Sequence, residues 1–188
     1  MQTLPGEILV KPRKMKQEMQ AKFSAGVTRA ELLNEYKGLT LPEKRVAACV
    51  ASLKDETLCQ LYSGRNNILI SLMFVQALFA AFAGYTTGLS IGGQAPYWLA
   101  GIAASISFLF IIGFYRHSLT AYLAYIFLSI SQLPNTFPSA NDEPIKLFII
   151  WSITVGTILY VWHVKSKLYP YFGFFGAKKE SGQFTFAR

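Results

Sequence analysis

The sequence predicts an all-α integral membrane protein, in which an N-terminal cytosolic helical segment precedes a bundle of four transmembrane helices. Hydrophobic residues make up 52% of the 188 residues and charged residues only 15%, whereas a typical soluble domain has about 25% charged residues. The charges are also unevenly distributed. Between positions 66 and 164 they are limited to Arg116, Asp142, Glu143 and Lys146. A charge at mid-membrane costs about 2.5–3.5 kcal/mol on insertion scales, so long uncharged runs indicate membrane spans.

Residues 1–66 are predicted to form a cytosolic or membrane-proximal helical region. Met15, Met19 and Phe23 recur at every fourth position among lysines and glutamines, which is the spacing of an amphipathic helix. This apolar stripe is a candidate contact for the membrane surface or for a partner helix. The alternative is that it packs against the other N-terminal helices.

Two capping boxes predict where the next helices begin. Threonine and glutamate stand three positions apart at 28–31 and again at 40–43, so that each side chain can bond to the backbone N–H of the other residue. The first box predicts a short helix that ends near Lys37. The second predicts a helix that runs to about Tyr62, where the polar run 63–67 ends it.

Four apolar segments predict the transmembrane domain, residues 67–166. They cover about 68–89, 97–115, 119–133 and 145–164. A helix of about 20 residues spans the roughly 30 Å hydrocarbon core. The third segment is short, and it either crosses fully or dips into the membrane and returns. We expect the first segment to act as an uncleaved signal-anchor, since no cleavable signal peptide is evident before it.

Four crossings place every basic cluster on one side of the membrane. Eleven basic residues lie in 1–66, Arg116 lies between the second and third segments, and five lie in 165–188, while the outer loops hold Lys146 alone. The positive-inside rule then predicts that both termini are cytoplasmic, and we expect the bacterial inner (plasma) membrane. The tail, 167–188, is basic and aromatic, and its part 169–179 is expected along the lipid headgroups, with Lys178 and Lys179 toward anionic lipid.

The sequence predicts no catalytic, cofactor or metal site. The interiors of the predicted spans contain no Asp, Glu, Lys or Arg, whereas proton-coupled transporters usually need an ionisable group there. Cys49 and Cys59 are expected to be reduced structural thiols. His117 and His163 fall at the predicted cytosolic ends of spans, where an interfacial position is expected rather than catalysis.

Polar and small residues of the first two spans are candidates for lining a pore or for helix–helix contact. Gln76 is the most polar side chain deep in the first span, and the others form small-xxx-small pairs that allow helices to approach closely. For Gln76 the alternative is a single hydrogen bond between helices of one protomer. The candidates are Gln76, Ala80, Gly84, Gly101 and Ser105.

The leading hypothesis is a non-enzymatic integral membrane component that acts through protein–protein contacts of its cytosolic helices. It would be an anchor, scaffold or sensor subunit of a membrane complex, in bacterial defence, immunity or secretion. One alternative is an oligomeric ion channel or membrane-perturbing effector, and another is a membrane-surface enzyme. Expected partners are membrane lipids, further copies or subunits and a soluble cytosolic protein. Nucleic acid is not expected despite the net charge of +8, because the basic residues flank apolar segments.

Overall fold

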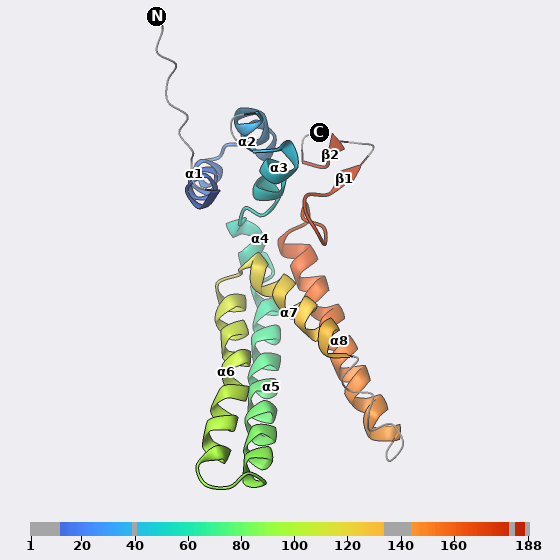
Figure 1. Cartoon of the computed structure of the whole chain (residues 1–188). Coiled ribbons are helices and arrows are strands. Elements are labelled where there is room, and N and C mark those ends of the chain that lie inside the picture. Colours follow the sequence, from blue (N-terminus) through green and yellow to red (C-terminus); the bar gives the residue numbers. More distant parts are fainter. Residues whose placement is uncertain (1–11, 39–40, 134–143, 181–182, 187–188) are drawn as a thin grey trace, which may run out of the picture. The chain divides into compact units, whose positions relative to one another are not determined.

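The computed structural model describes residues 12–38, 41–133, 144–180 and 183–186. Within these ranges the chain forms eight α-helices and one short two-stranded antiparallel sheet (Figure 1). The all-α prediction is confirmed. The chain divides into two compact units. We call the part up to Glu56 together with the part from Tyr169 onward the terminal unit, and residues 57–168 the helical unit.

Three helices begin the terminal unit: α1 (Pro12–Ser24), α2 (Arg29–Tyr36) and α3 (Glu43–Ala51). The capping box predicted at 28–31 is confirmed: Thr28 Oγ1 accepts from the N–H of Glu31 at 3.3 Å, and Glu31 Oε2 accepts from the N–H of Thr28 at 2.9 Å. At the second box, α3 begins at Glu43, while Thr40 lies outside the described residues.

The prediction of one helix from position 43 to about Tyr62 is wrong. Helix α3 ends at Ala51, and the short helix α4 (Glu56–Leu61) follows it. The break has a tertiary cause. The side-chain amide of Gln20, on α1, bonds to both backbone groups of Lys54, since its Nε2 donates to the carbonyl and its Oε1 accepts from the N–H, each at 2.9 Å. The N–H and the carbonyl of Lys54 therefore bond to α1, and not to backbone groups of a helix that continues from α3.

Both ends of the chain build the core of the terminal unit. The tail contributes strands β1 (Lys179–Glu180) and β2 (Gln183–Phe184), with Lys179 opposite Phe184. Phe184 and Phe186 are buried in the same cluster as residues of α1, α2 and α3. The cluster comprises Met15, Met19, Leu32, Leu33, Val46, Ala47, Val50, Ala51, Leu53, Phe184 and Phe186. The end of the tail is therefore part of the core of the terminal unit, whereas the contact with lipid headgroups expected for 169–179 stays a prediction.

The helical unit contains α5 (Ser63–Leu89), α6 (Ala95–Tyr115), α7 (Leu119–Gln132) and α8 (Pro144–Leu168). Their bounds lie close to the four predicted segments, but α5 begins earlier. The polar run 63–67 was expected to interrupt the chain, and it forms the first turns of α5 instead. Helices α5 and α6 lie antiparallel and side by side along their length (Figure 1).

Among the described helices, α5 and α6 are long and apolar enough to cross a membrane. Helix α7 is apolar but has only 14 residues, which corresponds to about 21 Å of rise. Helix α8 has 25 residues. Crossing by all four helices stays a prediction, and the loop expected on the outer side, with Asp142 and Glu143, lies outside the described residues.

Glycines allow the backbones of neighbouring helices to touch. A Cβ added at Gly84 would lie 2.6 Å from the carbonyl oxygen of Leu99, and one at Gly88 would lie 2.3 Å from Pro96 Cα. A Cβ at Gly113 would lie 2.4 Å from Cβ of Ala121, on α7. These distances are shorter than van der Waals contact distances. The packing of α5 on α6 and of α6 on α7 therefore requires glycine, which has no side chain, at these positions.

We predict that Gly88→Ala destabilises the α5–α6 hairpin. The new methyl group meets backbone atoms of Pro96 that cannot rotate away, so the helices must separate, at a cost of about 1–3 kcal/mol. The measurement is the midpoint of thermal unfolding of the detergent-purified chain. Gly101→Ala is the matched control, because a Cβ there meets nothing within 4 Å. Equal midpoints for the two variants would contradict the close approach of α5 and α6.

Candidate functional site

A buried polar contact joins three helices of the helical unit. Asn66 lies in the first turns of α5, and its side chain is only 1% exposed. Its Nδ2 donates to the carbonyl oxygen of Phe114 at 3.0 Å, near the end of α6, and its Oδ1 accepts from the hydroxyl of Tyr122, on α7, at 2.5 Å. Because a buried amide without partners is costly, these bonds specify how the three helix ends meet. We call Asn66, Tyr122 and the Phe114 carbonyl the polar junction.

Aromatic rings enclose the polar junction. The rings of Phe114 and Tyr122 are stacked with centroids 4.8 Å apart, and Tyr125 meets Phe114 at 5.8 Å. Phe110 completes the group by an edge-to-face contact with Tyr125 at 5.2 Å. Phe114 and Tyr122 are both fully buried. The hydrogen bonds of the junction therefore lie in a water-poor setting, where they are stronger and more costly to break.

Helix α8 reaches the same end of α5 through Arg65. The guanidinium Nη1 of Arg65 lies 2.9 Å from Nε2 of His163, and the hydroxyl of Tyr160 donates to the backbone carbonyl of Arg65 at 3.1 Å. Arginine can only donate, so Nε2 of His163 is the acceptor in this contact. His163 thus acts as a hydrogen-bond acceptor between α5 and α8. His117 occupies the α6–α7 turn, with a positive φ of 51°.

Gln76 makes a hydrogen bond to another helix of the same protomer. This was the alternative to the prediction that Gln76 lines a pore. Its Oε1 accepts from the hydroxyl of Tyr125, on α7, at 3.1 Å. The two small-residue pairs differ. Ala80 is half-buried and Gly84 packs on α6, whereas Gly101 and Ser105 are exposed on α6. The Ser105 hydroxyl donates to the carbonyl of Gly101 at 2.6 Å within the helix.

The stripe of α1 is not available as an exposed contact surface. Met15 and Met19 are buried in the core of the terminal unit, and Phe23 packs against that core. The correction has a simple cause, because α2, α3 and the tail cover the apolar face of α1. The alternative reading, packing against the other N-terminal helices, is the one that the structure has.

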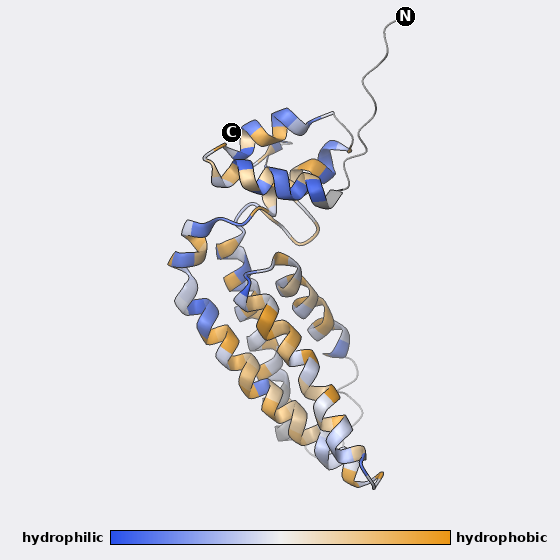
Figure 2. Ribbon diagram, turned by 90° about the vertical axis from the view of Figure 1, so that its left-hand side faces the viewer, coloured by the Kyte–Doolittle hydropathy of each residue, from blue (hydrophilic) through white to orange (hydrophobic). Residues whose placement is uncertain are grey.

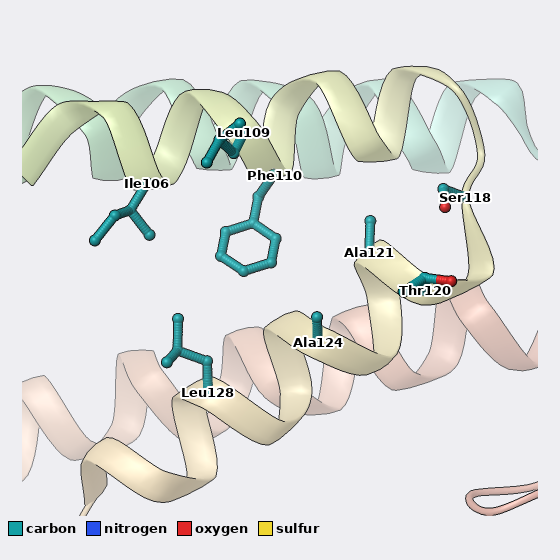
Figure 3. Close-up of a pocket in the computed structure, with 8 residues that line it drawn as sticks. All are labelled: Ile106, Leu109, Phe110, Ser118, Thr120, Ala121, Ala124 and Leu128. Atoms are coloured by element: carbon teal, nitrogen blue, oxygen red, sulfur yellow. The ribbon is translucent and has the colours of Figure 1, made fainter.

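An apolar groove lies between α6 and α7 (Figure 3). Its volume is about 390 Å³. Its lining residues are Ile106, Leu109, Phe110, Ser118, Thr120, Ala121, Ala124 and Leu128. The two helices are close where Gly113 meets Ala121, and Figure 3 shows them diverging from there. Such a groove can accept an acyl chain or the apolar side chains of another helix, but it offers little for polar recognition.

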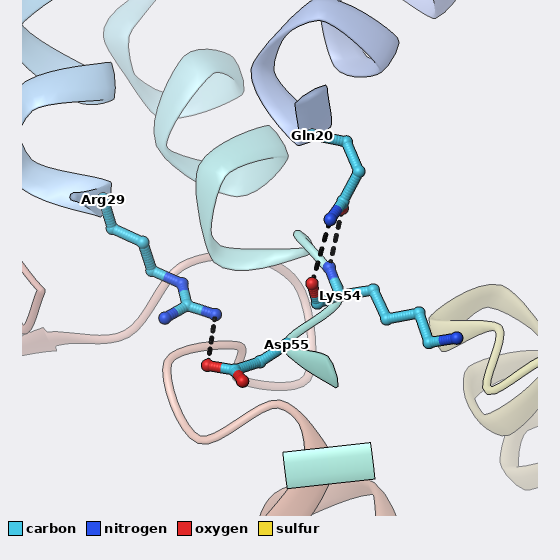
Figure 4. A network of polar contacts seen from close by, with 4 residues as sticks. All are labelled: Gln20, Arg29, Lys54 and Asp55. Atoms are coloured by element: carbon cyan, nitrogen blue, oxygen red, sulfur yellow. Dashed lines mark hydrogen bonds and ion pairs between the residues drawn. The ribbon is translucent and has the colours of Figure 1, made fainter. Parts of the chain in front are cut away.

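A second polar network holds the terminal unit together (Figure 4). Arg29, at the start of α2, pairs with Asp55 in the α3–α4 break, with Nη2 and Oδ2 3.7 Å apart. Its guanidinium also lies over the rings of Phe23 at 4.3 Å and of Tyr171 at 5.1 Å. Burial lowers the pKa of Arg29, and the carboxylate of Asp55 opposes that effect. Arg29 therefore connects α1, the α3–α4 break and the tail.

The hydrogen bonds, ring contacts and ion pair described above stabilise the fold. Within the described ranges, no group of three or more His, Cys, Asp or Glu could hold a metal ion. Cys49 and Cys59 form no disulfide within the described residues, and burial raises the pKa of Cys49, which disfavours its reactive thiolate form. Sequence reasoning missed Asn66, because it had been assigned to a turn, and missed Tyr122, because it sits in an apolar run.

We predict that Arg29→Met weakens the packing of the tail on the helices of the terminal unit. The substitution keeps the aliphatic length but removes the ion pair to Asp55 and the charge over Phe23 and Tyr171, at a cost of about 1–2 kcal/mol. Hydrogen exchange of residues 171–186 should become faster. Arg45→Met, at an exposed position of α3, is the control and should leave exchange unchanged. Unchanged protection in the Arg29 variant would contradict the role assigned here.

We predict that Asn66 and Tyr122 are energetically coupled. Tyr122→Phe removes one hydroxyl, while Asn66→Ala removes its acceptor, so the double variant should lose less stability than the two single losses added together. The expected coupling is about 0.5–1.5 kcal/mol, measured by unfolding in detergent. Tyr115→Phe, at an exposed position on the last turn of α6, should show no coupling with Asn66→Ala. If the stability losses of the substitutions at 66 and 122 simply add, the hydrogen bond proposed between these two side chains is contradicted.

Comparison with known proteins finds no match: no family model, curated protein or solved structure is significantly similar to this chain. Its function has therefore to be inferred from the features above. These are a terminal unit with its own core, a helical unit with a polar junction, and a groove between α6 and α7.

Proposed function

We propose that the chain is a non-enzymatic integral membrane protein that anchors its terminal unit at the cytosolic face, where this unit binds a protein partner. One observation carries the proposal. Both ends of the chain fold into one charged, water-compatible unit, while the helices between them turn large apolar side chains outward. A membrane anchor with a cytosolic domain requires this division of surfaces.

The outward apolar side chains favour lipid as the surroundings of the helical unit. Only 17% of the most apolar window of α5, and 17% of that of α6, is buried inside the protein. Leu78, Phe79 and Phe82 are among the exposed residues of α5, and Figure 2 shows apolar colouring along the helices. A core helix of a soluble protein would be mostly covered, and soluble proteins rarely expose contiguous apolar patches of this kind. Lipid accommodates such a surface at no cost.

The shared core of the terminal unit requires an even number of membrane crossings. Residues before α4 and residues after α8 pack in one cluster, so they must lie on the same side of any bilayer. If α5 and α6 cross, α7 and α8 must cross as a pair or not at all. Exposed apolar residues on both helices, among them Phe127 and Leu159, favour crossing. The short α7 would then need local thinning of the bilayer or continuation beyond Gln132.

The terminal unit is the part that is best suited to hold a partner. Two connections of the helical unit are short, with residues 90–94 joining α5 to α6 and 116–118 joining α6 to α7. The terminal unit has a core of its own, and charged side chains cover it, including Lys14, Lys16 and Glu18 of α1. A folded, charged module on a predominantly apolar anchor is suited to a protein–protein contact within a membrane complex.

Cysteine labelling of intact cells tests the topology. In a background with Cys49→Ser and Cys59→Ser, an impermeant thiol reagent should react with Gln94→Cys and Asn141→Cys from outside. Lys37→Cys and Lys178→Cys should react only after the cells are opened. Labelling of positions 37 and 178 from opposite sides would overturn the proposal, and protection of position 141 would reduce the four crossings to two.

Purification from native membranes tests the partner. The full chain should retain a specific protein, and charge reversal on the exposed face of α1, Lys14→Glu with Lys16→Glu, should release it while the thermal midpoint stays unchanged. The same double reversal at Arg45 and Lys167, both exposed, is a control for total charge. Recovery of the chain with lipid alone, under gentle detergent and after cross-linking, would contradict a protein-binding role.

A further inference from the structure

The tail carries an aromatic loop at the surface of the terminal unit. Residues 173–176 form a tight turn of sequence Gly-Phe-Phe-Gly between the chain segments on either side. Phe175 is 96% exposed, the highest value among the exposed large apolar residues, and Phe174 is exposed beside it, with the two ring centroids 4.7 Å apart. The side chain of Phe175 is therefore available for a contact outside the terminal unit.

Backbone hydrogen bonds hold this loop in its exposed position. The N–H of Gly173 donates to the carbonyl of Gly176 at 2.7 Å, and the N–H of Lys178 donates to the carbonyl of Tyr171 at 2.9 Å. Phe172 and Ala177 form an antiparallel bridge at the base of the loop. The ring of Tyr171 is fixed by Arg29 on one side and by Phe186 on another, at 6.0 Å. The aromatic tip is thus presented by a rigid base.

Basic side chains surround the tip. Lys178 and Lys179 follow the loop directly, and Lys44 of α3 lines the same pocket of about 410 Å³ as Phe174, Phe175 and Lys179. All three lysines are exposed. Glu43, next to Lys44, is paired with Lys37 at 3.2 Å, and Glu180 is the single acidic residue in the sequence from 169 to 188. The pocket therefore combines aromatic rings with an excess of positive charge.

We propose that this loop is a binding site for anionic phospholipid, with the rings of Phe174 and Phe175 in the headgroup layer and Lys44, Lys178 and Lys179 on the phosphates. The two chemistries match those of an acidic membrane surface, since aromatic rings favour the interface and lysines are drawn to anionic lipid. The loop also begins only five positions after Leu168, the last residue of α8. This inference rests on the proposed membrane anchorage, and it adds a lipid contact to the terminal unit itself.

Depth measurement in nanodiscs tests the site on the full-length chain. A Phe175→Cys variant, made with Cys49→Ser and Cys59→Ser, carries a nitroxide whose accessibility to oxygen and to a water-soluble nickel complex is compared. In phosphatidylglycerol nanodiscs the nitroxide should be protected from the nickel complex. In pure phosphatidylcholine it should be several-fold more accessible. The same label introduced by Lys37→Cys is the matched control in the terminal unit and should stay aqueous in both lipids.

The basic residues are tested with the same label. Replacing Lys44, Lys178 and Lys179 by glutamine should remove most of the difference between the two lipids, and lysines near an anionic surface are each worth roughly fivefold in binding. Free inorganic phosphate at millimolar concentration should not displace the loop from phosphatidylglycerol; displacement would indicate a soluble phosphate site and would contradict the proposal. A nitroxide at position 175 that stays aqueous in phosphatidylglycerol would overturn it, and the cysteine-labelling topology would be unaffected by that result.

Discussion

The hydrophobic core shared by the two ends of the chain is the constraint on which the rest of the structure depends. Met19 of α1 and Phe184 of the tail are buried in one cluster although the whole helical unit separates them in sequence. Closing so long a connection costs entropy, and burial of a large apolar side chain typically offsets about 1.5–3 kcal/mol. Because the cluster unites both ends, it also limits any membrane arrangement of the intervening helices to an even number of crossings.

The same core explains the local irregularities of the terminal unit. Packing α1 against α3 brings Gln20 to the backbone of Lys54, and this contact accompanies the end of α3 at Ala51. Packing the tail beside α2 brings Tyr171 to Arg29. A capping preference can state where a helix begins, but here the end of α3 depends on a side chain from another helix. Phe175 stays exposed, whereas Phe184 and Phe186 of the same tail are buried in the core.

The helical unit uses a different set of forces. Its helices bury few of their large apolar side chains, so hydrophobic burial between them is limited. Close backbone contact at Gly84, Gly88 and Gly113, together with the polar junction at Asn66, takes its place. These are the contacts expected where the surroundings are as apolar as the helices themselves, which agrees with the proposed anchorage in lipid. The polar junction also explains why the polar residues 63–67, before the first apolar segment, are helical.

Local signals in the sequence were sufficient for the helical class, for the capping box at Thr28 and for the bounds of the apolar helices to within a few residues. Such features depend on residues that are close in sequence, since a capping box acts over three positions and an apolar run is continuous. The break after Ala51, the inward fold of the tail and the role of Asn66 were not accessible in this way, and for Met15 and Met19 the spacing left burial and an exposed contact open as alternatives. Each depends on partners far along the chain: 34 positions separate Gln20 from Lys54, and 56 separate Asn66 from Tyr122. A polar residue next to an apolar segment is predicted to lie in a turn when only the sequence is known. The free energy cost of burying its side chain depends on hydrogen-bond partners that only the tertiary structure reveals.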